Sequence, residues 1–412
     1  MFEETPRKFD FVDKVKLRVG DLRVGMYVCE LDRPWLNTPF QLQGFEIRHD
    51  DEIEQLRRLC EYVYIDVLRT RVVHMTIEAI PPHSFLNERR LVSFEKEILA
   101  AEATHKNASI CIRGLINEVR FGKSVDIALA KAAVSDCVAS IIRNPDAIMF
   151  LTRMRSKDEY TSQHAFDVCI YSIIMGRFAG LQGRDLEELG TCGLLHDLGK
   201  LEIPEEILGK EGRLNRDEFA IIRQHTTKGR DILLAGRNLF SGTVDVAYGH
   251  HENLDGTGYP RGLEGHQLGQ YCKIVAIADK YDAITSERPY RMAHDHLEAV
   301  GILNRMAKEK QIDADFTGGF VAYMGIYPPG SIVQLTSGEV GIVLETNPQQ
   351  RLRPQLLVVR GADGSTLERF VDLAEKLKDE QGNPLKIKSV CRPEDYAIDV
   401  RQYRSVILNS FG

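Results

Sequence analysis

Strand-like alternation occupies both ends of this chain, and a long stretch with helical periodicity lies between them. Near the N-terminus, apolar residues alternate over 15–19, and the segments 26–31 and 62–66 have the composition of further strands. Between these two strands, residues 50–60 (DDEIEQLRRLC) begin with acidic side chains that favour a helix N-terminus. The pattern predicts a small α+β module over residues 1–80.

Residues 32–40 interrupt this module with an irregular loop. Pro34 and Pro39 fix the backbone there, and the loop holds Trp35, the only tryptophan of the chain. We expect Trp35 and Phe40 to anchor the loop on the small core of the module, with a ligand pocket as the alternative.

Residues 81–145 change character and form a helical linker. A charged, helix-favouring segment (84–108) precedes an amphipathic one (124–144). The apolar residues of the second segment recur at helical spacing and form one stripe, which comprises Val134, Cys137, Val138, Ile141 and Ile142. Two hypotheses stay open for this region: an element for homodimer formation or signal transmission, or a flange that packs on the next domain.

The helical pattern continues from 146 to 328 and predicts an all-α domain. The small residues at 190–193 allow two helices to approach closely, and Asn215 with Glu218 has the spacing of a capping box. The segment NLDGTGYPRG breaks the pattern with three glycines and a proline.

Beyond a proline-rich break, residues 329–412 return to strand patterns. A hairpin is expected around Ser337 and Gly338, and a second turn around Asp363 and Gly364. We expect a small β-barrel or sheet packed on the helical domain, with a structural lid as the favoured role and ligand sensing as the alternative.

Composition narrows the class of protein. No apolar run reaches the roughly eighteen residues of a membrane helix, and the acidic start is unlike a signal peptide. A net charge of −7 argues against general binding of duplex DNA or RNA. The eight cysteines are scattered without a CxxC pair, as is typical of a reduced, cytoplasmic protein.

Candidate metal ligands are concentrated in the helical domain. Seven histidine or aspartate residues lie between residues 164 and 279: His164, His196, Asp197, His225, His250, His251 and Asp279. Imidazole and carboxylate ligands in this number suit a two-metal site, in which a carboxylate such as Asp197 bridges both ions. Two adjacent metals generate hydroxide from water near neutral pH and clamp the oxygens of an in-line displacement at phosphorus.

The same residues carry a resemblance to a known family. The segments HDLGK (196–200), HHENLDGTGYP (250–260) and IADKYDAITSERPYR (277–291), with His164 and His225, resemble the HD-GYP branch of the HD-domain metal phosphohydrolases. The segment GMYVCELDRPWLNTPFQLQGF is similar to a module of unknown role that often precedes HD-GYP domains in bacteria. The resemblance implies a metal-dependent phosphodiesterase that linearises cyclic di-GMP to pGpG and sometimes continues to GMP.

The resemblance also implies roles for individual residues. It places His164, His196, Asp197 and Asp279 around one metal, and His225, His250 and His251 around another that shares Asp197. Iron or manganese is preferred, with nickel or zinc as alternatives. Lys200 is expected to bind a phosphate oxygen or assist the leaving group. Substrate contacts are further expected from Tyr259, Asp282, Arg288 and Arg291, and Glu252 is expected to support the ligands without binding metal.

Further expectations concern metal number and partners. Some family members carry a glutamate one turn before the first histidine and bind a third metal, whereas Tyr160 stands there in this chain, with Glu159 beside it. We therefore expect two metals and, at most, slow conversion of pGpG to GMP. The resemblance also implies a partner: GGDEF-domain proteins are expected to dock on the loop at 258–260. The alternative functions are a non-catalytic cyclic di-GMP receptor or scaffold, and a phosphohydrolase of another cyclic dinucleotide.

Overall fold

A computed structural model describes residues 14–22, 24, 26–33, 44–66, 90–154, 160–210, 212–236, 240–286 and 293–411. The described residues up to 66 form one compact unit with its own core. Those from 90 onwards, apart from 348–351, form a second unit. None of the helices in the described part of the chain combines the length and hydropathy that a membrane crossing requires.

The first unit is an antiparallel sheet with one helix. Its strands are β1 (Lys14–Arg18), β2 (Tyr27–Leu31), β3 (Phe45–Glu46) and β4 (Tyr62–Asp66), in the order β1-β4-β2-β3. A 3-10 turn, η1 (Val19–Asp21), follows β1. At the start of helix α1 (Asp50–Leu59), the Glu52 carboxylate accepts hydrogen bonds from the amides of Arg48 and His49. The predicted α+β fold is confirmed, while Trp35 and Phe40 lie outside the described residues.

The second unit is mainly helical. Its helices are α2 (Phe94–Arg120), α3 (Ile127–Arg143), α4 (Pro145–Thr152), α5 (Tyr160–Phe178), α6 (Arg184–Leu195), α7 (Glu205–Leu208), α8 (Arg216–Arg223), α9 (His225–Leu234), α10 (Ser241–Gly249), α11 (Gln270–Thr285), α12 (His296–Lys308) and α13 (Ala314–Met324), with 3-10 turns η5 (Leu198–Glu202) and η6 (Gly265–Gln267). The capping box of Asn215 and Glu218 forms at α8 as predicted. Asn144 and Pro145 start α4, where the Asn144 side chain accepts from the Asp146 amide.

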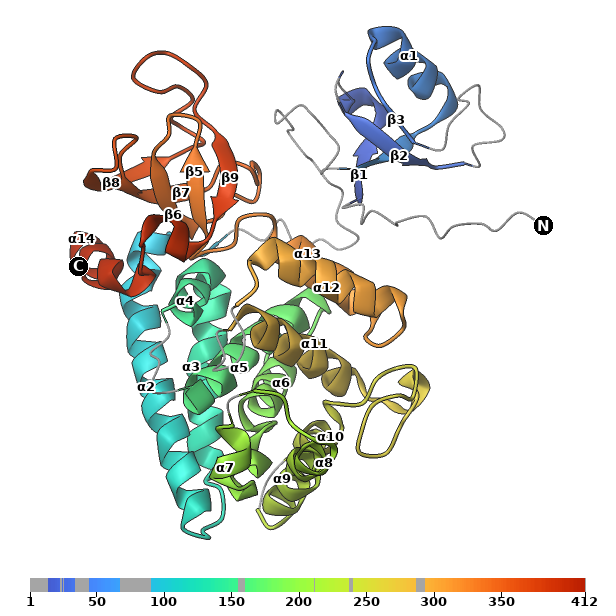
Figure 1. Ribbon diagram of the computed structural model, residues 1–412, viewed down its shortest axis with the longest axis vertical. Helices are drawn as coiled ribbons and strands as arrows, with labels where there is room; N and C mark the ends of the chain where they lie inside the picture. The colour runs from blue at the N-terminus through green and yellow to red at the C-terminus, as the bar shows by residue number, and fades with distance from the viewer. Residues whose placement is uncertain are drawn as a thin grey trace. The chain divides into compact units, whose positions relative to one another are not determined.

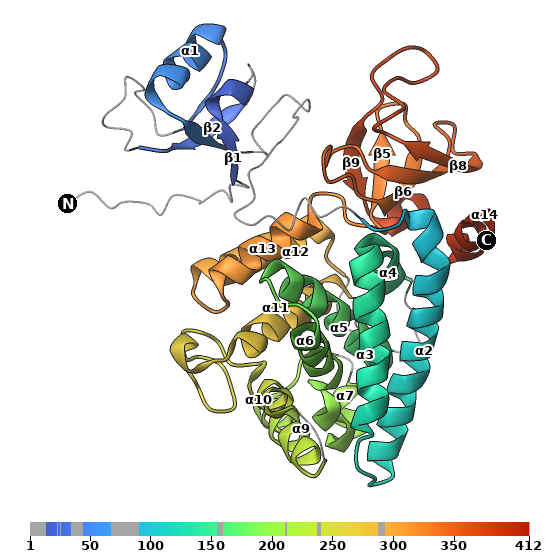
Figure 2. The same ribbon diagram turned by 180° about the vertical axis from the view of Figure 1, so that it is seen from behind.

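Helices α2 and α3 belong to the core of this unit. In both views they run side by side along one edge of the helices (Figures 1 and 2), and their apolar stripes join α5 and α6 in one cluster. The structure therefore favours the packing-flange hypothesis for this region. Ile142 departs from the predicted stripe because it is 41% exposed, whereas Ile141 is fully buried. Neighbouring helical residues point about 100° apart, so only one of the two faces the core.

A five-stranded antiparallel sheet follows the helices, as predicted. Its strands are β5 (Ile332–Leu335), β6 (Val340–Glu345), β7 (Gln355–Arg360), β8 (Thr366–Asp372) and β9 (Ile387–Cys391), in the order β8-β7-β6-β5-β9. The expected turns carry Gly338 and Gly364 at positive φ, a conformation that favours glycine. Two 3-10 turns, η7 (Pro393–Tyr396) and η8 (Val400–Tyr403), lead to α14 (Arg404–Phe411), which packs on α2.

Strand β6 joins the sheet to the helices. Val340, Ile342 and Leu344 belong to the helical core, whereas Val343 belongs to the separate core on the other side of the sheet. At its end, the Thr346 amide donates to the Asp146 carboxylate at 2.6 Å. The sheet and the helices are therefore parts of one folded unit.

Candidate metal centre

Helices α5, α6, α9, α10 and α11 deliver the candidate ligands to one place. His164 lies on α5, His196 and Asp197 follow α6, His225 begins α9, His250 and His251 follow α10, and Asp279 lies on α11. Most of these side chains sit at helix ends, where the chain turns and adjacent residues can face one cavity.

Glycine at 193 lets α6 pack directly on α5. A Cβ atom at Gly193 would lie 3.0 Å from both the Cα of Cys169 and the carbonyl oxygen of Val168, closer than ordinary van der Waals contact. This close approach, expected from the small residues at 190–193, brings His196 beside His164, with ring centroids 5.1 Å apart.

Sequence reasoning missed the role of Gly199. A Cβ atom here would collide with the carbonyl oxygen of His225 and the amide of Gly229, so only glycine lets η5 lie against the first turn of α9. This contact holds Asp197 close to His225. The signal for it was the place of Gly199 within HDLGK.

The candidate ligands gather in two groups. The inner group comprises His164, His196 and Asp279, and the outer group comprises His225, His250 and His251, with Asp197 beside them. Within each cluster the potential ligand atoms lie within 4.8 Å of one another. His251 is the most accessible ligand, with 22% of its side chain exposed.

The Asp197 carboxylate lies between the two groups. Its Oδ2 is 3.2 Å from Nε2 of His164 and 3.4 Å from Nε2 of His196. Its Oδ1 is 3.3 Å from Nε2 of His225 and 3.6 Å from Nε2 of His250. One oxygen therefore faces each group, the arrangement that a bridging carboxylate requires.

Hydrogen bonds fix the orientation of three imidazoles through the backbone. The Nδ1 atoms of His196 and His225 lie 2.7 Å from the carbonyl oxygens of Gly193 and Ile222, and Nδ1 of His250 lies 3.1 Å from that of Val246. Since a carbonyl can only accept, each Nδ1 carries the proton and each Nε2 presents a lone pair to the centre.

Asp282, which was predicted as a substrate contact, lies against His164 in the structure. Its carboxylate is fully buried, with Oδ2 at 2.7 Å from Nδ1 of His164 and 3.1 Å from Oγ of Ser286. Asp282 thus lies behind His164 and orients its ring. Asp279 and Asp282 share a face of α11 and lie about one turn apart. Asp279 belongs to the inner group, whereas Asp282 contacts the far side of the His164 ring.

Electrostatics favour carboxylates that are ready to bind metal. Burial opposes ionisation of Asp197 and Asp279, yet the pKa of each carboxyl lies well below its usual range. Lys200 and the surrounding imidazoles favour the anion of Asp197, and imidazoles alone favour that of Asp279. Burial also lowers the pKa of all three outer-group histidines, that of His225 to about 4. These imidazoles are therefore neutral near pH 7.

His164 differs from the outer histidines. Burial lowers the pKa of His164, but the carboxylates of Asp197 and Asp282 outweigh it and raise the pKa to about 9. Metal binding at His164 must therefore displace a proton, which couples affinity at the inner group to pH.

The residues fit a divalent transition metal. Among the described residues, Nε2 of His196 and Oδ1 of Asp197 are buried without a hydrogen-bond partner and point into the centre. Such atoms are costly to bury unless an ion satisfies them. The mixed imidazole and carboxylate set suits iron, manganese, nickel or zinc better than the all-oxygen preference of calcium or magnesium.

Two further predicted residues line the rim. The Lys200 ammonium donates to Oδ2 of Asp197, and 28% of its side chain is exposed. The half-buried Tyr259 ring stacks on His251, with centroids 4.8 Å apart. Glu252 binds no cluster: its buried carboxylate accepts from the amides of Arg261 and Leu263 and so holds the loop that carries Tyr259.

Several sequence predictions fall outside the described residues. These are Arg288 and Arg291, predicted substrate contacts, and Glu159 with the Tyr160 side chain, which bear on a third metal.

Comparisons with known proteins agree with this architecture. The HD domain family matches residues 151–316, a domain of unknown function (DUF3391) matches residues 14–130, and a KOW domain associated with HD domains matches residues 332–398. With its helical fold and paired His/Asp groups, the chain is an HD-domain protein of the metal-dependent phosphohydrolase type.

Relatives narrow the class further. The chain is 35% identical over 358 residues to cyclic di-GMP phosphodiesterase PA4108 of Pseudomonas aeruginosa. This alignment covers 83% of this chain and 84% of that protein. It is 36% identical over 170 residues to 3'3'-cGAMP-specific phosphodiesterase 1 of Vibrio cholerae, 41% of this chain and 39% of that protein. The solved structure of Bd1817, an HDG"Y"P protein from Bdellovibrio bacteriovorus, covers 75% of this chain and 98% of its own, at a TM-score of 0.46 and 16% identity. The chain belongs to the HD-GYP family of cyclic di-GMP phosphodiesterases.

Proposed function

We propose that this protein hydrolyses cyclic di-GMP to linear pGpG at a centre of two divalent metal ions. The observation that carries the proposal is the Asp197 carboxylate, which directs one oxygen toward each group of histidines. The 35% identity to a relative named as a cyclic di-GMP phosphodiesterase supports the choice of substrate.

The proposed ligands follow the two groups. His164, His196 and Asp279 would hold one ion, His225, His250 and His251 the other, and Asp197 both. Two such ions, when bound, lower the pKa of water and stabilise the oxygens of an in-line displacement at phosphorus. Iron or manganese is our preferred metal, nickel or zinc the alternative, and Tyr160 in place of glutamate favours two ions over three and slow conversion of pGpG to GMP.

Lys200 is proposed to act on the substrate. Its partly exposed ammonium lies at the rim, beside the carboxylate that both groups share. A cation there can bind a non-bridging phosphate oxygen or stabilise charge that develops on the leaving oxygen.

A different cyclic dinucleotide is the second candidate substrate. Another relative is named as specific for 3'3'-cGAMP, although it matches only 41% of this chain. A non-catalytic receptor is disfavoured by the complete ligand set. Docking of GGDEF domains on the loop at 258–260 and homodimer formation stay predictions.

The deciding experiment is hydrolysis of cyclic di-GMP by anaerobically purified, metal-analysed protein, alongside Asp197→Ala and the control Asp136→Ala. Asp136 is an exposed carboxylate on α3. About two metals per chain, accumulation of pGpG and an inactive Asp197→Ala variant would support the proposal. Full metal content with no turnover of cyclic di-GMP would contradict it.

A further inference from the structure

An aromatic and cationic ledge continues from the outer group to the surface. The Tyr259 ring stacks on His251. On Tyr259 lies the Arg223 guanidinium, with its central carbon 4.6 Å from the ring centroid. Phe219, one turn earlier on α8, lies 5.9 Å from the same carbon and 6.3 Å from the Tyr259 centroid. We call Phe219, Arg223 and Tyr259 the ledge.

The outer part of the ledge is open to a ligand. Arg223 is exposed, and Phe219 is 47% exposed although it is a large apolar side chain. No carboxylate in the described part of the chain lies within ion-pair distance of Arg223. Among the described residues its charge is met by the faces of two aromatic rings, those of Tyr259 and Phe219.

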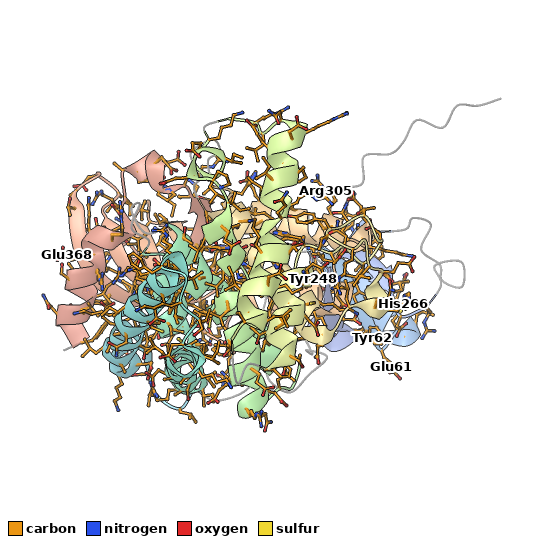
Figure 3. All side chains as sticks on the ribbon, turned by 90° about the horizontal axis from the view of Figure 1, so that it is seen from below. Glu61, Tyr62, Tyr248, His266, Arg305 and Glu368 are labelled. Carbon is orange, nitrogen blue, oxygen red and sulfur yellow. The ribbon has the colours of Figure 1, made fainter. Side chains whose placement is uncertain are left out.

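Arg230 provides a contrast within the same domain. Its guanidinium also lies over a tyrosine, 4.5 Å from the centroid of Tyr248, which is labelled in Figure 3. However, Arg230 pairs with Asp231 at 2.7 Å, and Tyr248 takes a second guanidinium, that of Arg261, at 4.5 Å. The charge of Arg230 is therefore paired with a carboxylate, whereas that of Arg223 has no carboxylate partner among the residues that the structure describes.

The chemistry of the ledge suits a purine base. A guanidinium over the face of a ring keeps N–H donors that a ligand can reach, and two of them match the O6 and N7 acceptors of guanine. Adenine presents a donor in place of O6 and cannot accept both bonds. An exposed aromatic ring beside the fork offers a stacking surface for the base, which a phosphate does not need.

We propose that Phe219 and Arg223 form a guanine subsite next to the metal centre and that Arg223 sets a preference for guanine over adenine in the substrate. This inference rests on the proposed hydrolysis of a cyclic dinucleotide. It assigns the scissile phosphate to the metal side of Tyr259 and one base to the far side.

The test compares Arg223→Gln with the matched control Arg230→Gln on three substrates. These are cyclic di-GMP, cyclic di-AMP and bis(4-nitrophenyl) phosphate, a diester with no base. For Arg223→Gln we expect kcat/KM on cyclic di-GMP to fall roughly tenfold to a hundredfold, mainly through KM, because one bidentate contact is lost. Turnover of cyclic di-AMP should hold or improve, since glutamine can bind adenine at N6 and N7. Arg230→Gln should leave the substrate preference unchanged.

The baseless diester separates the possible failures. Equal losses on both dinucleotides would overturn the guanine assignment and make Arg223 a phosphate contact. If Arg223→Gln also loses turnover of bis(4-nitrophenyl) phosphate and contains less metal, the guanine assignment is overturned. Arg223 would then act by supporting Tyr259 beside the metal centre. If the unmodified protein cleaves only the baseless diester, the proposed function itself fails. Phe219→Leu adds a second check, with a higher KM expected for both dinucleotides.

Discussion

The inner and outer groups of the metal centre are built from similar residues but are held in different ways. The inner group lies within the helical core, where His164 is oriented by the buried carboxylate of Asp282. The outer group reaches the rim, where His251 is partly exposed and packs on Tyr259 from a loop. Buried, charge-assisted support makes a rigid, tightly binding site, whereas exposure permits exchange with solvent.

The difference teaches that one carboxylate can face two groups of residues that differ in burial and in hydrogen-bond support. The Asp197 carboxylate faces both groups, so either group keeps its other side chains when one of its neighbours is altered. Variants within a single group should therefore remove one metal and not two.

The largest expected effect comes from removing one ligand of each group. Asp279→Ala should lose the inner metal and His251→Ala the outer one, and each should reduce turnover of cyclic di-GMP at least about a hundredfold. Metal analysis of the purified variants measures the loss, with His266→Ala, an exposed histidine of the same loop region, as control. Loss of both metals from His251→Ala would show that the groups are not independent.

Next in size are two glycine variants that act through the backbone. Gly199→Ala should push η5 away from α9, lower stability by about 1–3 kcal/mol and reduce outer metal content. Gly193→Ala meets its neighbours at 3.0 Å and should instead disturb the inner group. Thermal unfolding and metal analysis measure both, with Gly301→Ala, where nothing lies within 4 Å, as control. Full outer occupancy in Gly199→Ala would contradict the role given to this contact.

A smaller effect is expected from Asp282→Asn. The amide oxygen can still accept from His164, but the negative charge that makes the imidazole a better ligand is lost. Metal affinity of the inner group should fall about tenfold to a hundredfold, as measured by competition with a chelator. Ser286→Ala removes only a hydrogen bond to Asp282 and should lower the metal affinity of the inner group less. Weaker metal binding by the outer group in Asp282→Asn would contradict the role of Asp282 in supporting His164.

The smallest effect concerns rates of metal release. A chelator should remove metal in two phases, and Tyr259→Leu should accelerate only the fast one, because Tyr259 covers His251. A metal-sensitive dye follows the release. A single phase in the unmodified protein would show that the two groups exchange alike.

The sequence predicted the composition of the centre better than its supports. The candidate ligands are chemically distinctive and lie at spacings that resemble one family, so the set could be proposed from residue identity. Asp282 is also an acid on the same helix face, and only the packing of α5 on α11 shows that it lies behind His164.

Contacts between distant segments explain the other misses. The ledge requires Tyr259 to reach back to Arg223 on another element, which no local pattern encodes. The stripe on α3 was predictable from periodicity, but Ile142 was assigned to it because a period alone does not show where the packing partner ends.

Strand β6 carries a consequence for dissecting this molecule. Because Ile342 and Leu344 pack on the helices, a fragment that stops before β5 would expose an apolar patch on the helical surface. Such a fragment should aggregate on expression even though every candidate metal ligand is present. The sheet is thus a partner in solubility for the helices, and the shortest well-behaved fragment with this centre keeps both.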